Sequence, residues 1–202
     1  MKLKDYKVKL SCSFQPYEMK SSYTTENIMY LYYDLVFKHK KIKVKFSGGD
    51  LGHSFIQFIN HLKQMINDEL PYLSYGETTK VYYISNASRL DEATSDSSFK
   101  ATKVEYVDEV YYTLIFKNPN GQSLCLDFLE EEEVLEFMNY CDSQINKMLE
   151  QTALADDIIL TIGKDKFEWE LYNKICEDLF DKQLTKEEVI SNYYKNKEKR
   201  GI

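Results

Sequence analysis

The chain has 202 residues, of which 43% are hydrophobic and 29% are charged, and its formal net charge is -7. These values are those of an ordinary globular protein, and they exclude a wholly disordered, collagen-like or coiled-coil chain. At this length folding removes about 70% of the surface of the unfolded chain, so we expect a full hydrophobic core. No apolar stretch reaches the roughly 18 residues that cross a bilayer, and the charged N-terminus does not resemble a signal peptide. We therefore expect a soluble, cytoplasmic protein without membrane contact.

The charge is unevenly distributed along the chain. Residues 1–50 contain ten lysines and five acidic residues, a net charge of +5, so residues 51–202 carry the remaining -12. Direct nucleic-acid binding needs clustered basic residues, and the pI of about 5.1 argues against it. A strongly acidic region suits a basic protein partner, although a solvated surface is the commoner reason for such a bias.

The sequence contains no motif for a metal or a cofactor, and we expect neither. Cys12, Cys125, Cys141 and Cys176 form no C-x-x-C pair and lie in or beside apolar positions, where a free cysteine behaves as a small hydrophobe. The three histidines are scattered, so no zinc-binding spacing can be drawn. Unpaired cysteines of this kind are typical of a reducing compartment.

The first fifty residues predict three antiparallel strands. Residues 6–14 alternate apolar and polar side chains, as a half-buried strand does, and a polar loop with Pro16 is expected to follow. Residues 28–38 and 41–47 also alternate, and the short link between them predicts a hairpin.

A glycine pair separates these strands from a predicted helix. Gly48 and Gly49 are expected to end the third strand, and Asp50 is placed to cap a helix that extends over residues 51–70. Glycines between a strand and a helix can also bind phosphate through free backbone N–H groups. The neighbouring residues lack the known phosphate-binding patterns, so we predict a turn and a cap here.

Residues 79–150 predict further strands and a second helix. Strands are expected at 79–85, 99–107, 109–117 and 122–128, with a loop at 87–98. Asn118-Pro119-Asn120-Gly121 is a strong turn signal. Asp127 and Glu130 resemble a capping box at the start of the helix. The predicted buried stripe of this helix is Val134, Met138, Cys141, Ile145 and Met148.

The C-terminal residues predict helices. Residues 167–171 alternate like a strand, but Phe167, Leu171, Ile175 and Leu179 also fit a helical stripe, whose length favours the helix. Thr185 and Glu188 form a capping box for the last helix.

Two segments of the chain resemble each other. Tyr32–Lys38 and Tyr111–Lys117 agree at five of seven positions, and the similarity resumes in the next strand and helix, where residues 42, 44 and 46 align with 124, 126 and 128. Duplication explains this better than shared periodicity alone.

We predict an α+β fold with antiparallel sheet segments from two pseudo-repeated β-β-β-α units, residues 1–75 and 76–152, and helices packed on one face. Residues 153–202 are expected to form a helical C-terminal segment of the same compact domain.

An acidic block at the start of the second helix is the first candidate for partner binding. It contains Glu130, Glu131, Glu132, Glu133 and Glu136. Acidic residues complement the positive end of a helix, which is the commoner reason for such a block. Four in a row exceed what capping needs, so contact with a basic protein is a second interpretation.

The outer face of the predicted sheet is the second candidate. Leu35, Phe37, Leu114 and Phe116 form the core face, while Tyr30, Tyr32, Val36, Tyr111 and Ile115 have the opposite parity, together with several lysines. A sheet face in water should carry mostly polar residues, so these side chains must be covered. Either the C-terminal helices cover them, or Tyr30, Tyr32 and Tyr111 belong to an interface, for which tyrosine is well suited.

These features favour a binding protein over an enzyme. Our first hypothesis is a non-enzymatic acidic antagonist, such as a toxin-immunity protein or a phage-encoded inhibitor, that binds a basic protein stoichiometrically. The excess of lysine over arginine, 24 to 2, fits an AT-rich bacterial or phage genome. The alternatives are an oligomeric structural or adaptor protein that uses the sheet face and, third, an enzyme with an unrecognised site near the glycine pair.

Overall fold

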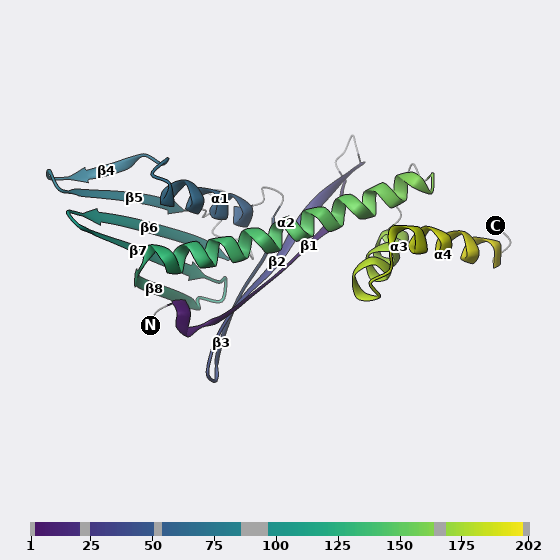
Figure 1. The fold of residues 1–202 in the computed structure, drawn as a ribbon, viewed down its shortest axis with the longest axis horizontal. Coiled ribbons are helices and arrows are strands. Elements are labelled where there is room, and N and C mark those ends of the chain that lie inside the picture. Colours follow the sequence, from purple (N-terminus) through teal and green to yellow (C-terminus); the bar gives the residue numbers. More distant parts are fainter. Residues whose placement is uncertain (1–2, 21–24, 51–53, 86–96, 164–168, 200–202) are drawn as a thin grey trace. The chain divides into compact units, whose positions relative to one another are not determined.

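The structure is a computed structural model that describes residues 3–20, 25–50, 54–85, 97–163 and 169–199. The chain forms two compact units, Met1–Ile145 and Asn146–Ile202. The fold is α+β, as predicted, with two antiparallel sheets and helices (Figure 1). The division expected after residue 152 falls within one continuous helix.

Sheet A contains β1 (Lys7–Lys20), β2 (Thr25–His39) and β3 (Ile42–Asp50), in that order. The predicted loop around Pro16 is wrong, because Pro16 lies within β1 in register with Met29. Proline is tolerated there because β1 is an edge strand, where one side of the backbone needs no hydrogen bonds from the sheet.

Gly48 and Gly49 do not end the third strand, contrary to the sequence-based expectation. β3 continues to Asp50, which pairs with Leu31 and therefore does not cap the helix that begins at Ser54. The glycine at position 48 is required by packing, since a Cβ atom there would lie 2.5 Å from the hydroxyl oxygen of Tyr33. Tyr33 is only 3% exposed and stacks on Phe55, with ring centroids 4.8 Å apart, so its ring has no room to move aside.

We therefore expect Gly48→Ala to lower the free energy of unfolding by about 1–3 kcal/mol, the usual cost of overpacking a core. Urea unfolding of the two proteins measures this difference. The same substitution in a Tyr33→Leu background should cost less, because the shorter side chain leaves space for the added methyl group. Equal costs in both backgrounds would show that the close approach of Tyr33 is not the reason for the glycine.

Sheet B contains β4 (Tyr72–Tyr75), β5 (Thr79–Ser85), β6 (Ser98–Tyr106), β7 (Glu109–Lys117) and β8 (Ser123–Leu129), in chain order. The last four strands and the turn before β8 are confirmed, and the N–H of Gly121 donates to the carbonyl of Asn118 over 3.0 Å. β4 was not predicted, because its four residues are too few to show a period. Most of the loop predicted at 87–98 lies outside the described residues.

α1 (Ser54–Ile66) and the first part of α2 (Glu131–Thr161) lie on the same face of sheet B (Figure 1). The capping box predicted at Asp127 and Glu130 is wrong by three residues. Asp127 lies in β8, and it is the backbone N–H of Glu130 that donates to a carboxylate oxygen of Glu133, over 3.3 Å. The predicted stripe of α2 is confirmed, since all five of its residues are buried.

The core of the first unit lies between the two sheets and these helices. Phe116 is fully buried at its centre and contacts aromatic rings from both sheets and both helices: Phe37, Phe46, Phe58, Phe99 and Phe137. The prediction that these residues form the core face of their strands is confirmed, because Leu35, Phe37 and Leu114 are likewise 0% exposed.

The two similar segments occupy the central strands of two meanders, β1-β2-β3 and β6-β7-β8, and a helix follows each meander. Strand pairing corrects the alignment of the next strand by two residues. Phe37 pairs with Val44, and its counterpart Phe116 pairs with Leu124, so Val44 rather than Ile42 corresponds to Leu124. The origin of this similarity by duplication stays a prediction.

The second unit is helical. It contains the end of α2, α3 (Trp169–Cys176), the π-helical turn η2 (Glu177–Asp181) and α4 (Lys186–Lys199). Residues 169–171 are therefore helical, and the predicted capping box is confirmed by reciprocal hydrogen bonds between Thr185 and Glu188 of 2.8 and 3.2 Å. Ile175 and Leu179 are buried as their spacing predicted.

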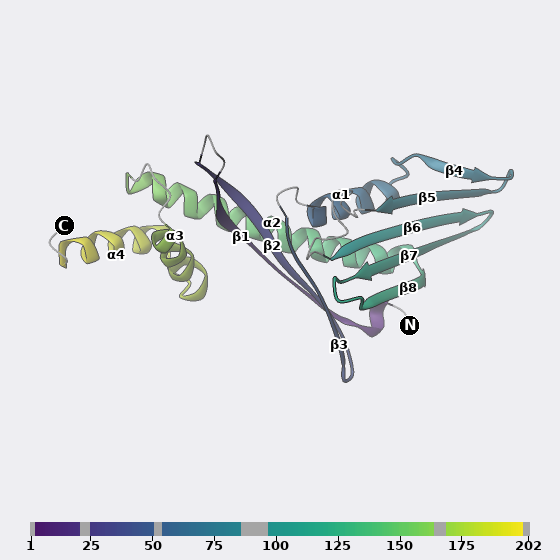
Figure 2. The ribbon, with the colours of Figure 1, turned by 180° about the vertical axis from the view of Figure 1, so that it is seen from behind.

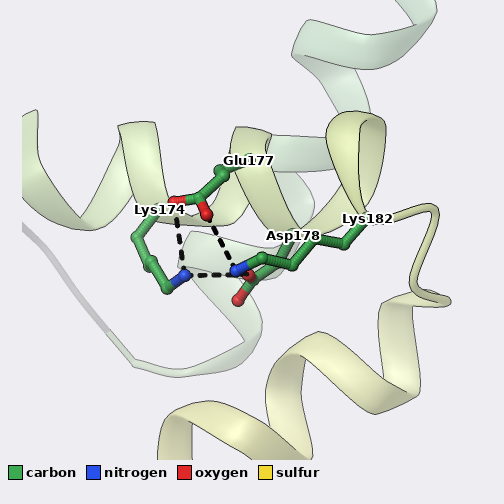
Figure 3. A network of polar contacts seen from close by, with 4 residues as sticks. All are labelled: Lys174, Glu177, Asp178 and Lys182. Atoms are coloured by element: carbon green, nitrogen blue, oxygen red, sulfur yellow. Dashed lines mark hydrogen bonds and ion pairs between the residues drawn. The ribbon is translucent and has the colours of Figure 1, made fainter.

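A network of two lysines and two acidic residues joins α3 to the π-helical turn (Figure 3). Lys174 lies 3.0 Å and Lys182 2.9 Å from the same carboxylate oxygen of Asp178, which is 7% exposed. Both lysines also contact Glu177, at 3.3 and 2.8 Å. The four charges neutralise one another, so we interpret the network as structural rather than as a ligand site.

Candidate functional site

The acidic block at the start of α2 separates into structural and exposed residues. Glu131 accepts a hydrogen bond from the hydroxyl of buried Tyr112 over 3.0 Å. Glu133 is 8% exposed and accepts backbone N–H groups from Glu130 and Lys4, over 3.3 and 3.4 Å. Glu132 and Glu136 are exposed. Two of the five predicted residues therefore hold the helix in place, and reversing their charge would disturb folding as well as binding.

A cavity of about 180 Å³ lies beside this block. Its lining comes from η1 (Leu3–Asp5), from the start of β1 and from the first turns of α2: Leu3, Lys4, Tyr6, Val8, Glu133, Glu136, Phe137 and Tyr140. The apolar members Leu3, Tyr6 and Phe137 are buried. Cavities that bind whole small molecules usually measure about 300–1,000 Å³, so this one suits a single long side chain.

The polar groups of the cavity favour a positively charged occupant. Within the described residues neither Glu133 nor Glu136 forms an ion pair, and with Lys4 as the one basic residue of the lining the cavity keeps an excess of negative charge. Tyr140 accepts the backbone N–H of Leu10 over 3.0 Å, so its hydroxyl oxygen already acts as an acceptor at the edge of the cavity. Apolar walls with two carboxylates match the methylene stem and charged end of lysine or arginine.

The predicted tyrosines do not form one surface. Tyr30 belongs to β2, but its side chain lies outside the described residues. Tyr32 is 38% exposed on sheet A. On the same face Lys7, Lys38 and Lys43 stand in register across the three strands, and Val36 lies between Lys9 and Lys45. Val36 is half-buried, and the lysine charges discourage association of this face.

Tyr111 lies instead on the outer face of sheet B, because it alternates with the buried residues Tyr112 and Leu114 of β7. Figure 2 shows this sheet from the side opposite α2. Strand register aligns it with an apolar residue on each of the strands β4 to β6: Leu73, Val81 and Val104. On β8, where the pairing with β7 is irregular, Phe128 contacts the ring of Tyr111. The rings of Tyr111 and Phe128 are 5.7 Å apart. Leu73 is 60% and Phe128 72% exposed. We call these five residues the outer apolar row.

A buried lysine is the functional candidate that the sequence patterns did not reveal. Lys103 in β6 is 2% exposed and forms ion pairs with Asp68 and, over 2.8 Å, with Glu105. Its ammonium also lies over the rings of Tyr82 and Tyr112, 5.0 and 5.9 Å from their centroids. One feature of the sequence does indicate this burial. Lys103 has the same strand parity as Phe99 and Ala101, which lie on the inner face of β6.

Electrostatics assign Lys103 a structural role. Burial alone would lower the pKa of its ammonium group, but hydrogen bonds to Asp68 and Glu105 outweigh burial and hold the pKa above its ordinary value. A lysine that acts as a base or nucleophile needs the opposite shift. The ion pair instead fastens the segment after α1 to sheet B.

The described residues contain no cluster of three or more histidine, cysteine, aspartate or glutamate side chains that could hold a metal. All four cysteines are free; Cys141 is buried, Cys12 and Cys176 are half-buried, and Cys125 is exposed. Among the helices described, none is long and apolar enough to cross a membrane.

Comparison of the chain with family models, curated proteins and solved structures found no match in any of the three. Function is therefore inferred from the geometry of the chain itself.

Proposed function

We propose that this chain is a non-enzymatic antagonist that binds a basic protein one to one through the acidic surface at the start of α2. The observation that supports this most directly is the cavity beside Glu133 and Glu136, whose lining carries two carboxylates and one lysine, Lys4, over an apolar floor. In this proposal a lysine or arginine side chain of the partner enters the cavity, and Glu132 contributes to the surrounding potential. Free cysteines agree with action in the reducing cytoplasm of a bacterium or of a phage-infected cell.

Inhibition by occupancy needs no catalytic group, and an acidic inhibitor is attracted to basic, nucleic-acid-handling proteins. Exposed charges are screened beyond about 8 Å at physiological ionic strength, so association should slow as salt is added.

An oligomeric adaptor is the second candidate, favoured by the outer apolar row. An enzyme has less support, because the buried polar cluster around Lys103 is satisfied internally.

Charge reversal of exposed residues tests this proposal. We expect the double variant Glu132→Lys and Glu136→Lys to weaken binding of the basic partner at least about tenfold, since interfacial like-charge contacts cost several kcal/mol. Both side chains are exposed, so unfolding by urea should change little. The measurement is one-to-one capture from extract of the source cells by the immobilised chain, with the captured protein then titrated by calorimetry.

The matched control is Glu69→Lys, which changes an exposed acidic residue away from the cavity and should retain binding. A second measurement uses a defined probe, Nα-acetyl-arginine amide, titrated into the isotope-labelled chain. We expect amide signals of Lys4 and Phe137 to shift, and the neutral citrulline analogue to leave them unchanged. Equal binding by wild type and the double variant, together with no shift by the arginine probe, would refute this site.

A further inference from the structure

The outer face of sheet B has an apolar centre. The outer apolar row crosses all five strands, and tyrosines of β4, β5 and β6 flank it: Tyr75, Tyr83 and Tyr106, which are 60%, 55% and 52% exposed. Isolated apolar residues on a surface need no explanation, but a continuous row of cross-strand neighbours marks an interaction site. Tyrosine and phenylalanine are also the residues enriched in protein interfaces.

The two ends of this face carry opposite charges. Asp108 and Glu109 lie at the hairpin end between β6 and β7, and Glu77 lies in the adjacent hairpin, whose Thr78 carbonyl accepts the N–H of Val107 over 3.4 Å. The opposite end carries Lys100 on β6 and Lys117 on β7. Strand parity places Lys100, Lys117 and Glu109 on the outer face with Tyr111.

We propose that this face binds a second copy of the chain, face to face, about a two-fold axis that runs along the outer apolar row. Rotation by 180° about that axis reverses the strand direction and places each strand over its own copy. The acidic hairpin end of β6 and β7 then lies over the half of the second copy that carries Lys100 and, further along the strands, Lys117, and the apolar row packs on itself. A two-fold interface must be self-complementary in this way.

The charge pattern selects this axis over the other simple arrangement. An axis parallel to the strands would place the acidic end on the acidic end and the lysines on the lysines, and like charges in contact cost several kcal/mol. A basic protein as occupant of the same face would meet Lys100 and Lys117 unfavourably. The second copy is therefore the occupant that satisfies both ends, and this dimer leaves the acidic cavity of the proposed function outside its interface.

The first test is the oligomeric state of the full chain by sedimentation velocity over a range of concentrations. We expect reversible formation of a dimer with no larger species. The variant Val104→Glu places a charge in the middle of the row, on the central strand, and should abolish the dimer. A wild-type chain that remains monomeric at all concentrations would overturn the proposal, and it is the result expected if the C-terminal helices cover this face.

The second test uses two charge variants with matched changes. The first carries Lys100→Glu and Lys117→Glu, and the second carries Asp108→Lys and Glu109→Lys. Each alone should weaken dimerisation at least about tenfold, because the changed residues then face charges of their own sign. An equimolar mixture should recover much of the wild-type affinity, since the changed positions of each variant face opposite charges on the other.

The mixture also controls for folding, because a misfolded variant cannot be rescued by its counterpart. Wild-type-like dimers from the first variant alone would overturn the two-fold axis along the row, since the axis parallel to the strands predicts no change for that variant. Failure of the mixture to associate would likewise contradict the charge pairing. Neither outcome bears on binding of a basic partner at the cavity, which Glu132→Lys with Glu136→Lys tests separately.

Discussion

Phe116→Ala is expected to destabilise the protein by about 3–5 kcal/mol, as the loss of a fully buried aromatic ring usually does. Phe116 is 0% exposed and contacts five aromatic rings from β2, β3, α1, β6 and α2. Its removal leaves a cavity that these elements cannot fill, because each is also held by its own backbone hydrogen bonds. Urea unfolding followed by far-ultraviolet circular dichroism measures the change.

The neighbouring residue provides the control. Ile115 is half-buried on the outer face of the same strand, so Ile115→Ala should cost only about 1 kcal/mol. If Phe116→Ala fails to fold, Phe116→Leu keeps part of the volume and should give a smaller, measurable loss. Equal losses for Phe116→Ala and Ile115→Ala would contradict the assignment of the inner face as the core.

Lys103→Met should have the next largest effect, a loss of about 2–3 kcal/mol. Removing one member of a buried ion pair commonly costs about 3–5 kcal/mol because the partner charge is left unpaired. The side chains of Asp68 and Glu105 are 56% and 22% exposed, so water partly replaces the lost ion pairs and we expect a smaller loss of stability than for a fully buried pair. Lys63→Met, at an exposed position of α1, is the matched control and should change stability by less than about 0.5 kcal/mol.

The same substitution should alter the acid dependence of stability. The hydrogen bond from Lys103 holds the pKa of Asp68 below its ordinary value of 3.8. A carboxyl whose pKa is lowered on folding contributes stability above its unfolded pKa, and this contribution is lost as pH falls through the folded pKa. Between about pH 5 and pH 2 the wild type should therefore lose more stability than Lys103→Met. Parallel pH profiles would show that the ion pair contributes little.

The candidate sites show where local patterns are sufficient and where they are not. The acidic block is visible in the sequence, but its division into structural and exposed residues is not. Glu131 becomes structural because Tyr112 approaches it, and Glu133 binds the distant backbone of Lys4 as well as that of nearby Glu130. Likewise, parity assigns Tyr32 and Tyr111 to outward faces, yet the two residues lie on different sheets, where Tyr32 is in register with Ser13 and Gly49 and Tyr111 with Val104.

The sequence by itself determined the fold class, most strands, the buried stripe of α2 and the last capping box, because these depend on periodicity and on contacts between residues close in the chain. Tertiary structure decided the rest. Gly48 remains in a strand because the ring of Tyr33 occupies the space of a side chain, and Lys103 is buried because Asp68 reaches it. The outer apolar row likewise exists only through the register of β4 to β7 and the ring contact of Tyr111 with Phe128, since no two of its members are neighbours in the sequence. Pairing between distant segments depends on the whole core, and a local pattern carries no information about it.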